Sequence, residues 1–226
     1  MWNDVIAMRE PYASLFPRLR IQARRALSAH PECHGWDHTL RVWRNTVEIL
    51  MSEQADTAVA QYAAVLHDVG RAAEFADNGE SCHAEVGAAM VPDLLAEVGV
   101  TDPAFIDHVA ECVRTHRFRA RSGRRPASLE AKIVYDADKL DSMGAVGVGR
   151  AFHFAGRVGA RVHNTKAEAL AAESYSLEDS AYREYLVKLS AIQDKLLTPA
   201  GRRLGRRRHE FMAAFFDELI AETGVA

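Results

Sequence analysis

Apolar positions recur three and four residues apart along most of the chain, which is the spacing of one face of a helix. Leu40, Trp43, Val47 and Leu50 illustrate the pattern, and Asp37 precedes them as a candidate N-cap. No run of alternating β-branched residues is long enough to predict a sheet. The chain is therefore predicted to be all-α.

Capping signals predict where five further helices begin or end. These helices run from about Thr57 to Val69, from a cap at Ser81 to about Val98, from Asp102-Pro103 onward, from Pro126 to Leu140, and from Thr198-Pro199 along a stripe of Phe211, Phe215 and Leu219. The stretches 77–80, 117–125 and 153–175 are weakly patterned. We expect one domain over 1–226, with a core at about 20–155 and C-terminal helices at about 176–224 packed on it.

Composition narrows the class of protein. Of 226 residues, 48 % are hydrophobic, enough for a sizeable core, and the net charge of −3 gives no general attraction to nucleic acid or anionic lipid. The three cysteines, Cys33, Cys82 and Cys112, show no paired spacing and no reason to be activated. The N-terminal segment lacks a basic region followed by a long apolar run, so we do not expect it to be a signal peptide, and the sequence has no stretch of 18 apolar residues. We therefore expect a cytoplasmic protein without membrane contact and without specific nucleic-acid binding.

The pair His67-Asp68 ends an otherwise apolar helix. Adjacent helical side chains diverge by about 100°, so both cannot enter the core, but both can reach an ion near the edge between their directions. An imidazole and a carboxylate together suit a borderline-hard divalent ion. A partly buried histidine paired with its neighbouring carboxylate explains this pair equally well.

His38 and an acidic cluster at Asp136, Asp138 and Asp141 favour the metal. Each lies in a predicted helix whose other residues are largely apolar, where charge is costly unless a cation satisfies it. A divalent ion would do so. Three basic side chains would also serve, namely Lys132, Lys139 and Arg150.

The ordered set His…His-Asp…Asp resembles the HD-domain superfamily of metal-dependent phosphohydrolases, in its small single-domain bacterial branch. The resemblance rests on HGWDHTLRV, AAVLHDVGR, HAEVGAAM and YDADKLDSMGAVGVGRAF, and it covers nearly the whole chain. It implies a helical fold with a metal in the bundle core, held by His38, His67, Asp68 and Asp138, with Asp68 also catalytic. Mn²⁺ is favoured, and Mg²⁺, Ni²⁺, Co²⁺, Fe²⁺ and Zn²⁺ stay open.

The same resemblance implies hydrolysis of a phosphoester or phosphoanhydride by metal-activated water, in a small substrate that we expect to be a nucleotide. Further side chains flank the ligand segments and are candidates for contacts with the substrate phosphate: His34, Arg41, Arg71, His83, His116 and Lys139. For His83 and His116 we favour this role over a second metal. His108, His153 and His163 are interpreted as structural or surface residues, and the arginines of 117–125 as a solvated loop.

Two other classes of function stay open. One is an HD-type di-iron oxygenase, which would need ligands beyond the four. The other is a regulatory or binding module that keeps the metal without turnover. Hydrolysis of guanosine polyphosphates is supported only by the type of site. The sequence does not decide whether the protein forms a homodimer.

Overall fold

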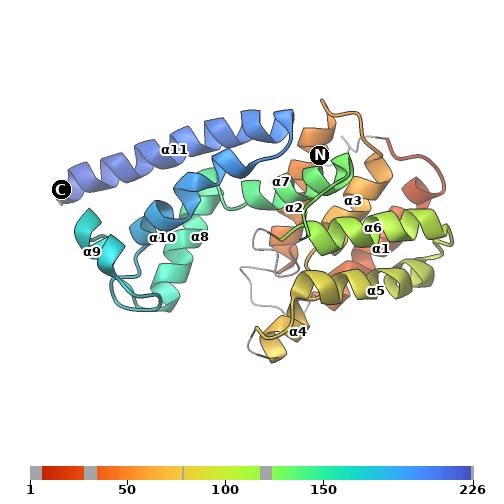
Figure 1. Cartoon of the computed structure of the whole chain (residues 1–226), viewed down its shortest axis with the longest axis horizontal. Coiled ribbons are helices and arrows are strands. Elements are labelled where there is room, and N and C mark those ends of the chain that lie inside the picture. Colours follow the sequence, from red (N-terminus) through yellow and green to blue (C-terminus); the bar gives the residue numbers. More distant parts are fainter. Residues whose placement is uncertain (1–6, 28–34, 78, 118–123, 225–226) are drawn as a thin grey trace. The chain divides into compact units, whose positions relative to one another are not determined.

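The computed structural model describes residues 7–27, 35–77, 79–117 and 124–224 of the chain. These residues form helices joined by turns and contain no strand, so the predicted all-α fold class is confirmed. Contacts divide the chain into two compact units, Met1–Asp138 and Lys139–Ala226 (Figure 1). This boundary lies earlier than the predicted end of the core at about 155. The expected single-domain organisation stays a prediction.

The first unit is a group of helices around α3. Its elements are α1 (Tyr12–Ala26), α2 (Trp36–Leu50), α3 (Thr57–Leu66), α4 (Arg71–Ala76), α5 (His83–Val98), α6 (Pro103–Thr115) and most of α7 (Leu129–Leu140). Helix α3 packs against α1, α2 and α6, and its residues from Ala58 to Leu66 are all buried. A helix that is apolar on every side belongs in the interior. The centre of this unit is therefore the segment that leads into His67 and Asp68.

Three of the predicted helix ends are confirmed. Asp102 caps α6 by accepting hydrogen bonds from the backbone N–H groups of Ala104 and Phe105. Gly99 ends α5 in the left-handed conformation, with φ of 97°. Thr198 caps α11 by accepting from the N–H of Gly201. These ends were predictable because each depends on one local side chain or on a missing Cβ.

Other predicted boundaries were wrong. Gly35, and not Asp37, is the N-cap of α2, because the helix already begins at Trp36. Cys82, and not Ser81, is the N-cap of α5. Helix α3 ends at Leu66 rather than at about Val69, and α7 begins at Leu129 rather than at Pro126.

The second unit contains α8 (Gly144–Arg157), α9 (Lys166–Ala171), α10 (Ala181–Val187), the short 3₁₀ turns η2 (Leu189–Ala191) and η3 (Gln193–Lys195), and α11 (Pro199–Thr223). Helix α11 packs on α8 and η3. Its buried aromatic residue is Phe216, whose ring centroid lies 4.5 Å from that of Tyr185. Phe211 and Phe215 lie in α11 as predicted and share one face with Leu219, but both phenylalanines are exposed.

Among the described residues, no helix combines the length and the apolar character that crossing a membrane requires.

Candidate metal centre

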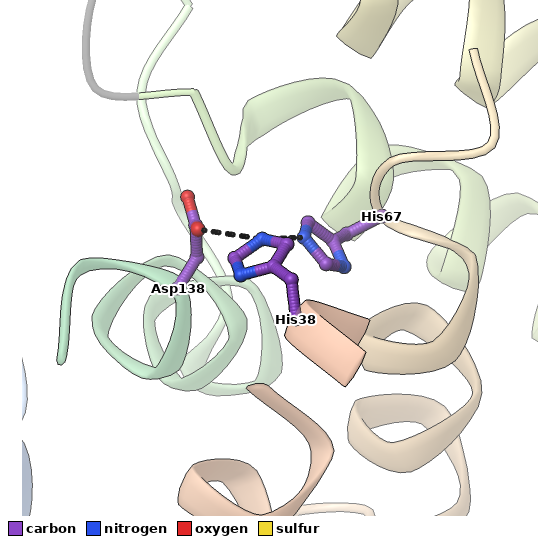
Figure 2. Close-up of side chains that lie close together, drawn as sticks. All are labelled: His38, His67 and Asp138. Atoms are coloured by element: carbon purple, nitrogen blue, oxygen red, sulfur yellow. Dashed lines mark hydrogen bonds and ion pairs between the residues drawn. The ribbon is translucent and has the colours of Figure 1, made fainter. Parts of the chain in front are cut away.

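His38 and Asp138 come from α2 and α7, one hundred positions apart, and their side chains meet. The Nε2 atom of His38 lies 3.5 Å from Oδ1 of Asp138 (Figure 2). Asn45, two turns after His38 on α2, donates a 2.9 Å hydrogen bond to the carbonyl of Ala137. This buried bond joins α2 to α7 directly beside Asp138, and it therefore helps to hold the side chains of His38 and Asp138 relative to each other.

His67 and Asp68 lie in the turn that follows the last residue of α3. The Nδ1 atom of His67 lies 2.8 Å from the carbonyl oxygen of Ala64, one of the carbonyls that a helix end leaves without a helical partner. Because a carbonyl can only accept, Nδ1 donates and Nε2 of His67 carries the lone pair. That atom lies 3.2 Å from Nε2 of His38, as Figure 2 shows.

Asp68 completes the group with its Oδ2 atom. This oxygen lies 3.5 Å from Nε2 of His38 and 3.6 Å from Nε2 of His67. The four side chains named as ligands from the sequence thus gather within one small volume. Metal binding by them stays a prediction.

The donor set fits a divalent cation. Bonds of about 2.1 Å in octahedral coordination would place neighbouring donor atoms about 3 Å apart, close to the observed 3.2–3.6 Å. His38, His67 and Asp68 are buried, and burial lowers the pKa of His67, which favours its neutral, ligating form. Buried charge and converging lone pairs both call for a cation.

A second histidine pair faces the other oxygen of Asp68. His83 begins α5, and His116 directly follows α6. Their Nε2 atoms lie 3.3 Å apart and 3.5 and 3.6 Å from Oδ1 of Asp68. Each carboxylate oxygen of Asp68 therefore faces one pair, and the pairs adjoin, because the ring centroids of His67 and His116 lie 5.1 Å apart and ligand atoms of His67, Asp68 and His116 lie within 4.8 Å of one another. The sequence suggested no such close pair, because its two members are 33 positions apart.

His116 repeats the local arrangement of His67. Its Nδ1 atom lies 2.6 Å from the carbonyl oxygen of Val113, in the last turn of α6. In both cases a histidine just past a helix donates from Nδ1 to the carbonyl three residues earlier. The helix end thereby orients the ring, and Nε2 is directed toward Asp68.

The approach of α5 to this centre depends on Gly70, which faces Gly87 of α5. A Cβ on Gly70 would lie 2.2 Å from the carbonyl oxygen of His83 and 2.5 Å from the backbone nitrogen of Gly87. Both distances are far shorter than a van der Waals contact. The missing side chain at Gly70 therefore lets the start of α5, with His83, lie against the turn that holds Asp68.

Glu74 connects the second histidine pair to two arginines. Its Oε2 accepts from Nη1 of Arg71 at 2.7 Å and lies 2.8 Å from Nδ1 of His83, while Oε1 lies 3.1 Å from Nη2 of Arg117. Arg71 also donates from Nε to Oδ1 of Asp68 at 3.0 Å. Glu74 lies in none of the sequence motifs named above, and Arg117 was expected to lie in a solvated loop. The i, i+3 spacing of Arg71 and Glu74 was the available signal.

Cys82 lies beside this network. Burial raises the pKa of its thiol, but hydrogen bonds from the backbone N–H of Glu85 and from the Arg117 guanidinium outweigh burial, so the pKa is lowered overall. Nη1 of Arg117 lies 3.4 Å from the sulfur. No local pattern indicates a lowered pKa for Cys82, because Arg117 is 35 positions away.

Three further residues were predicted from the sequence to contact the substrate phosphate. Arg41 is half-buried on α2, three residues after His38. His34 lies outside the described residues, and Lys139 begins the second unit. The roles of these three residues stay predictions.

Two other polar residues have structural partners. His108 lies 3.1 Å from Oγ of Ser128 and 3.3 Å from Oε2 of Glu130, where α6 meets the start of α7, in keeping with its structural interpretation. In the second unit, Arg150 donates to Oδ2 of Asp141 at 2.8 Å. One carboxylate of the acidic cluster is thus satisfied by a basic side chain rather than a metal.

Residues 35–143 match the model of the HD domain family. The chain is 32 % identical over 204 residues to the uncharacterized protein YpgQ of Bacillus subtilis, covering 89 % of this chain and 90 % of that protein. Its fold is similar to the crystal structure of YpgQ in complex with ADP, with a TM-score of 0.68, 29 % identity and coverage of 93 % and 96 % of the two chains. It is also similar to an HD-superfamily hydrolase from Bacillus thuringiensis, with a TM-score of 0.72, 25 % identity and coverage of 95 % and 100 %.

Proposed function

Because the chain belongs to the HD-domain family, we propose that it is a metal-dependent phosphohydrolase whose substrate is a small phosphorylated molecule of the nucleotide class. The observation that carries the proposal is the convergence of four donor side chains from α2, the turn after α3, and α7. The nucleotide class is supported by YpgQ, which was crystallised with ADP.

In this proposal His38, His67, Asp68 and Asp138 hold one divalent ion, with Mn²⁺ favoured and the other divalent ions of the resemblance open. A bound divalent ion lowers the pKa of water and polarises a phosphoryl oxygen. Two imidazoles and two carboxylates occupy four positions and leave room for water and phosphate oxygens. No nucleophilic side chain is needed.

Asp68 is the proposed catalytic residue. Its Oδ2 faces His38 and His67, while Arg71 donates to Oδ1. Asp68 can thus hold a proton of the attacking water on its Oδ2 side. The hydrogen bond from Arg71 to Oδ1 keeps the plane of the Asp68 carboxylate fixed. Contacts to the substrate phosphate are proposed for His34, Arg41, Arg71 and Lys139.

A panel of nucleoside mono-, di- and triphosphates with added Mn²⁺, assayed for phosphate and pyrophosphate, tests the proposal. We expect turnover of at least one nucleotide, and loss of both bound metal and turnover in Asp68→Ala with helical content retained. Asp93→Ala, at an exposed carboxylate of α5, is the matched control and should behave as wild type. Confirmed metal binding without turnover of any nucleotide would contradict it, as would full activity in Asp68→Ala.

A di-iron oxygenase is a second candidate, favoured by one observation. The pair His83 and His116 offers nitrogen ligands beyond the four, next to Oδ1 of Asp68. Counting metals separates the two functions. One ion per chain with phosphate release supports hydrolysis, whereas two irons with a charge-transfer absorption band support oxidation.

A further inference from the structure

Glu74 is a buried carboxylate on the short helix α4, at the point where three segments meet. Its partners come from its own helix, from the first residue of α5, and from the residue that follows His116. None of the ligand motifs in the sequence includes it. Its position raises the question of what it does for the side chains that surround Asp68.

The chemistry of these contacts fixes which atom carries each proton. A carboxylate that accepts from Arg71 and Arg117 is negatively charged and has no proton to give. The Nδ1 atom of His83, 2.8 Å from Glu74, must therefore be the donor. In the neutral ring, Nε2 of His83 then carries a lone pair.

This lone pair lies 3.5 Å from Oδ1 of Asp68 and 3.3 Å from Nε2 of His116. The His116 ring is held in the same tautomer by its contact with the Val113 carbonyl. Two lone pairs and a carboxylate oxygen thus face one another. A phosphate oxygen, itself an acceptor, is a poor neighbour for such a group, whereas a proton donor or a cation is a good one.

We propose that Glu74 is a positioning residue of the metal centre, whose carboxylate holds His83 in the Nδ1–H tautomer with its Nε2 lone pair directed toward Asp68. His83 then acts as a hydrogen-bond acceptor and not as a phosphate donor, in contrast to the expectation from the sequence. Removing a carboxylate that orients a metal-ligating histidine typically lowers metal affinity or activity about 10- to 100-fold, and we expect a loss of this size for Glu74. The kinetic consequence rests on the proposed hydrolytic function, but the tautomer does not.

The tautomer is measured directly by long-range ¹H–¹⁵N correlation spectra of ¹⁵N-histidine protein with diamagnetic Mg²⁺ present. The His83 signals are assigned by their loss in His83→Gln. We expect wild-type His83 to carry its proton on Nδ1, and Glu74→Ala to move it toward Nε2, the form that imidazole prefers in water. A proton on Nε2 in wild type overturns the proposal, and so does an unchanged Nδ1–H tautomer in Glu74→Ala. The wild-type measurement decides even if the variant does not fold.

The kinetic arm compares Glu74→Ala with Glu85→Gln. Glu85 lies on the first turn of α5, and this change removes one carboxylate charge from its part-buried ion pair with Arg114 of α6. We expect Glu74→Ala to lower kcat about 10- to 100-fold with little change in KM, and Glu85→Gln to match wild type. A purely structural role for Glu74 would lower the folded fraction and leave kcat per folded molecule unchanged, and that result overturns the proposal. Failure of the proposed function would appear differently, as no turnover in wild type while the tautomer result stands.

Discussion

Replacing Gly70 by alanine adds one methyl group where α5 approaches the turn that carries Asp68. The new Cβ would lie 2.2 Å from the His83 carbonyl oxygen and 2.5 Å from the Gly87 nitrogen. Both are backbone atoms, so no side-chain rotation can relieve the overlap. Ordinary contact requires about 3.4 Å, and α5 must therefore move by about 1 Å relative to Asp68.

This displacement has two separate consequences. Overpacking of this kind costs about 1–3 kcal/mol, which for a chain of this length lowers Tm by about 2–4 °C per kcal/mol. Moving His83 by about 1 Å from Asp68 is also expected to lower kcat by about 100-fold, because catalysis depends on that geometry. The proposed metal ligands His38 and Asp138 lie on other helices, so metal affinity should fall much less than kcat.

The assay combines thermal unfolding, Mn²⁺ titration and initial rates of nucleotide hydrolysis. Gly149→Ala is the matched control, because Gly149 lies in α8 with nothing within 4 Å of its would-be Cβ. That change should stabilise the protein by up to about 1 kcal/mol. Wild-type Tm and rates in Gly70→Ala would refute the close approach on which the position of His83 depends.

Three further predictions use other parts of the structure. Cys82, with its lowered pKa, should be alkylated by iodoacetamide at pH 7.5 far faster than Cys112, whose pKa burial raises to about 12, and peptide mass spectrometry that finds equal rates would contradict this. Burial lowers the pKa of His67, and it lowers the pKa of His83 to about 2. Below about pH 6.5, the unfolded state of the metal-free protein therefore binds protons on these two histidines that the folded state does not bind. The unfolding free energy should therefore fall by about 1.4 kcal/mol per pH unit for each histidine as the pH decreases from 6.5. Urea unfolding that gives equal stability at pH 7.5 and pH 5.5 would exclude this pH dependence. Thr198→Ala should lower the free energy of unfolding by about 1 kcal/mol, because the hydroxyl caps α11, whereas Thr198→Ser keeps the hydroxyl and should match wild type in urea unfolding. Equal stability of all three proteins would show that the cap is not needed.

Local signals in the sequence were sufficient for several helices. Asp102, Gly99 and Thr198 mark helix ends because capping depends on one residue and its near neighbours. The ligand motifs were found because the resemblance names them in order, and the structure brings those four side chains together.

The prediction failed where a boundary depends on packing. His67 and Asp68 were predicted to lie at the end of a helix, but α3 ends before them, at Leu66. The ring of His67 instead donates a hydrogen bond from Nδ1 to the Ala64 carbonyl at the helix end. Phe211 and Phe215 share a helical stripe with Leu219, yet the neighbouring Phe216 is the buried aromatic residue. Periodicity identifies a helix face but does not show which face another helix will cover.

Long-range polar contacts were beyond the sequence altogether. Glu74 meets Arg117 only because α4 and the end of α6 lie near the start of α5. His83 and His116 meet because α5 and α6 pack side by side and Gly70 permits the close approach (Figure 1). No local pattern encodes such a meeting.

The most direct test of the metal centre is anomalous X-ray scattering from crystals of the wild-type protein grown with Mn²⁺. We expect one strong peak within about 2.0–2.4 Å of His38 Nε2, His67 Nε2, Asp68 and Asp138. A fully occupied Mn²⁺ bound elsewhere, with Asp138 outside its coordination sphere, would contradict the account.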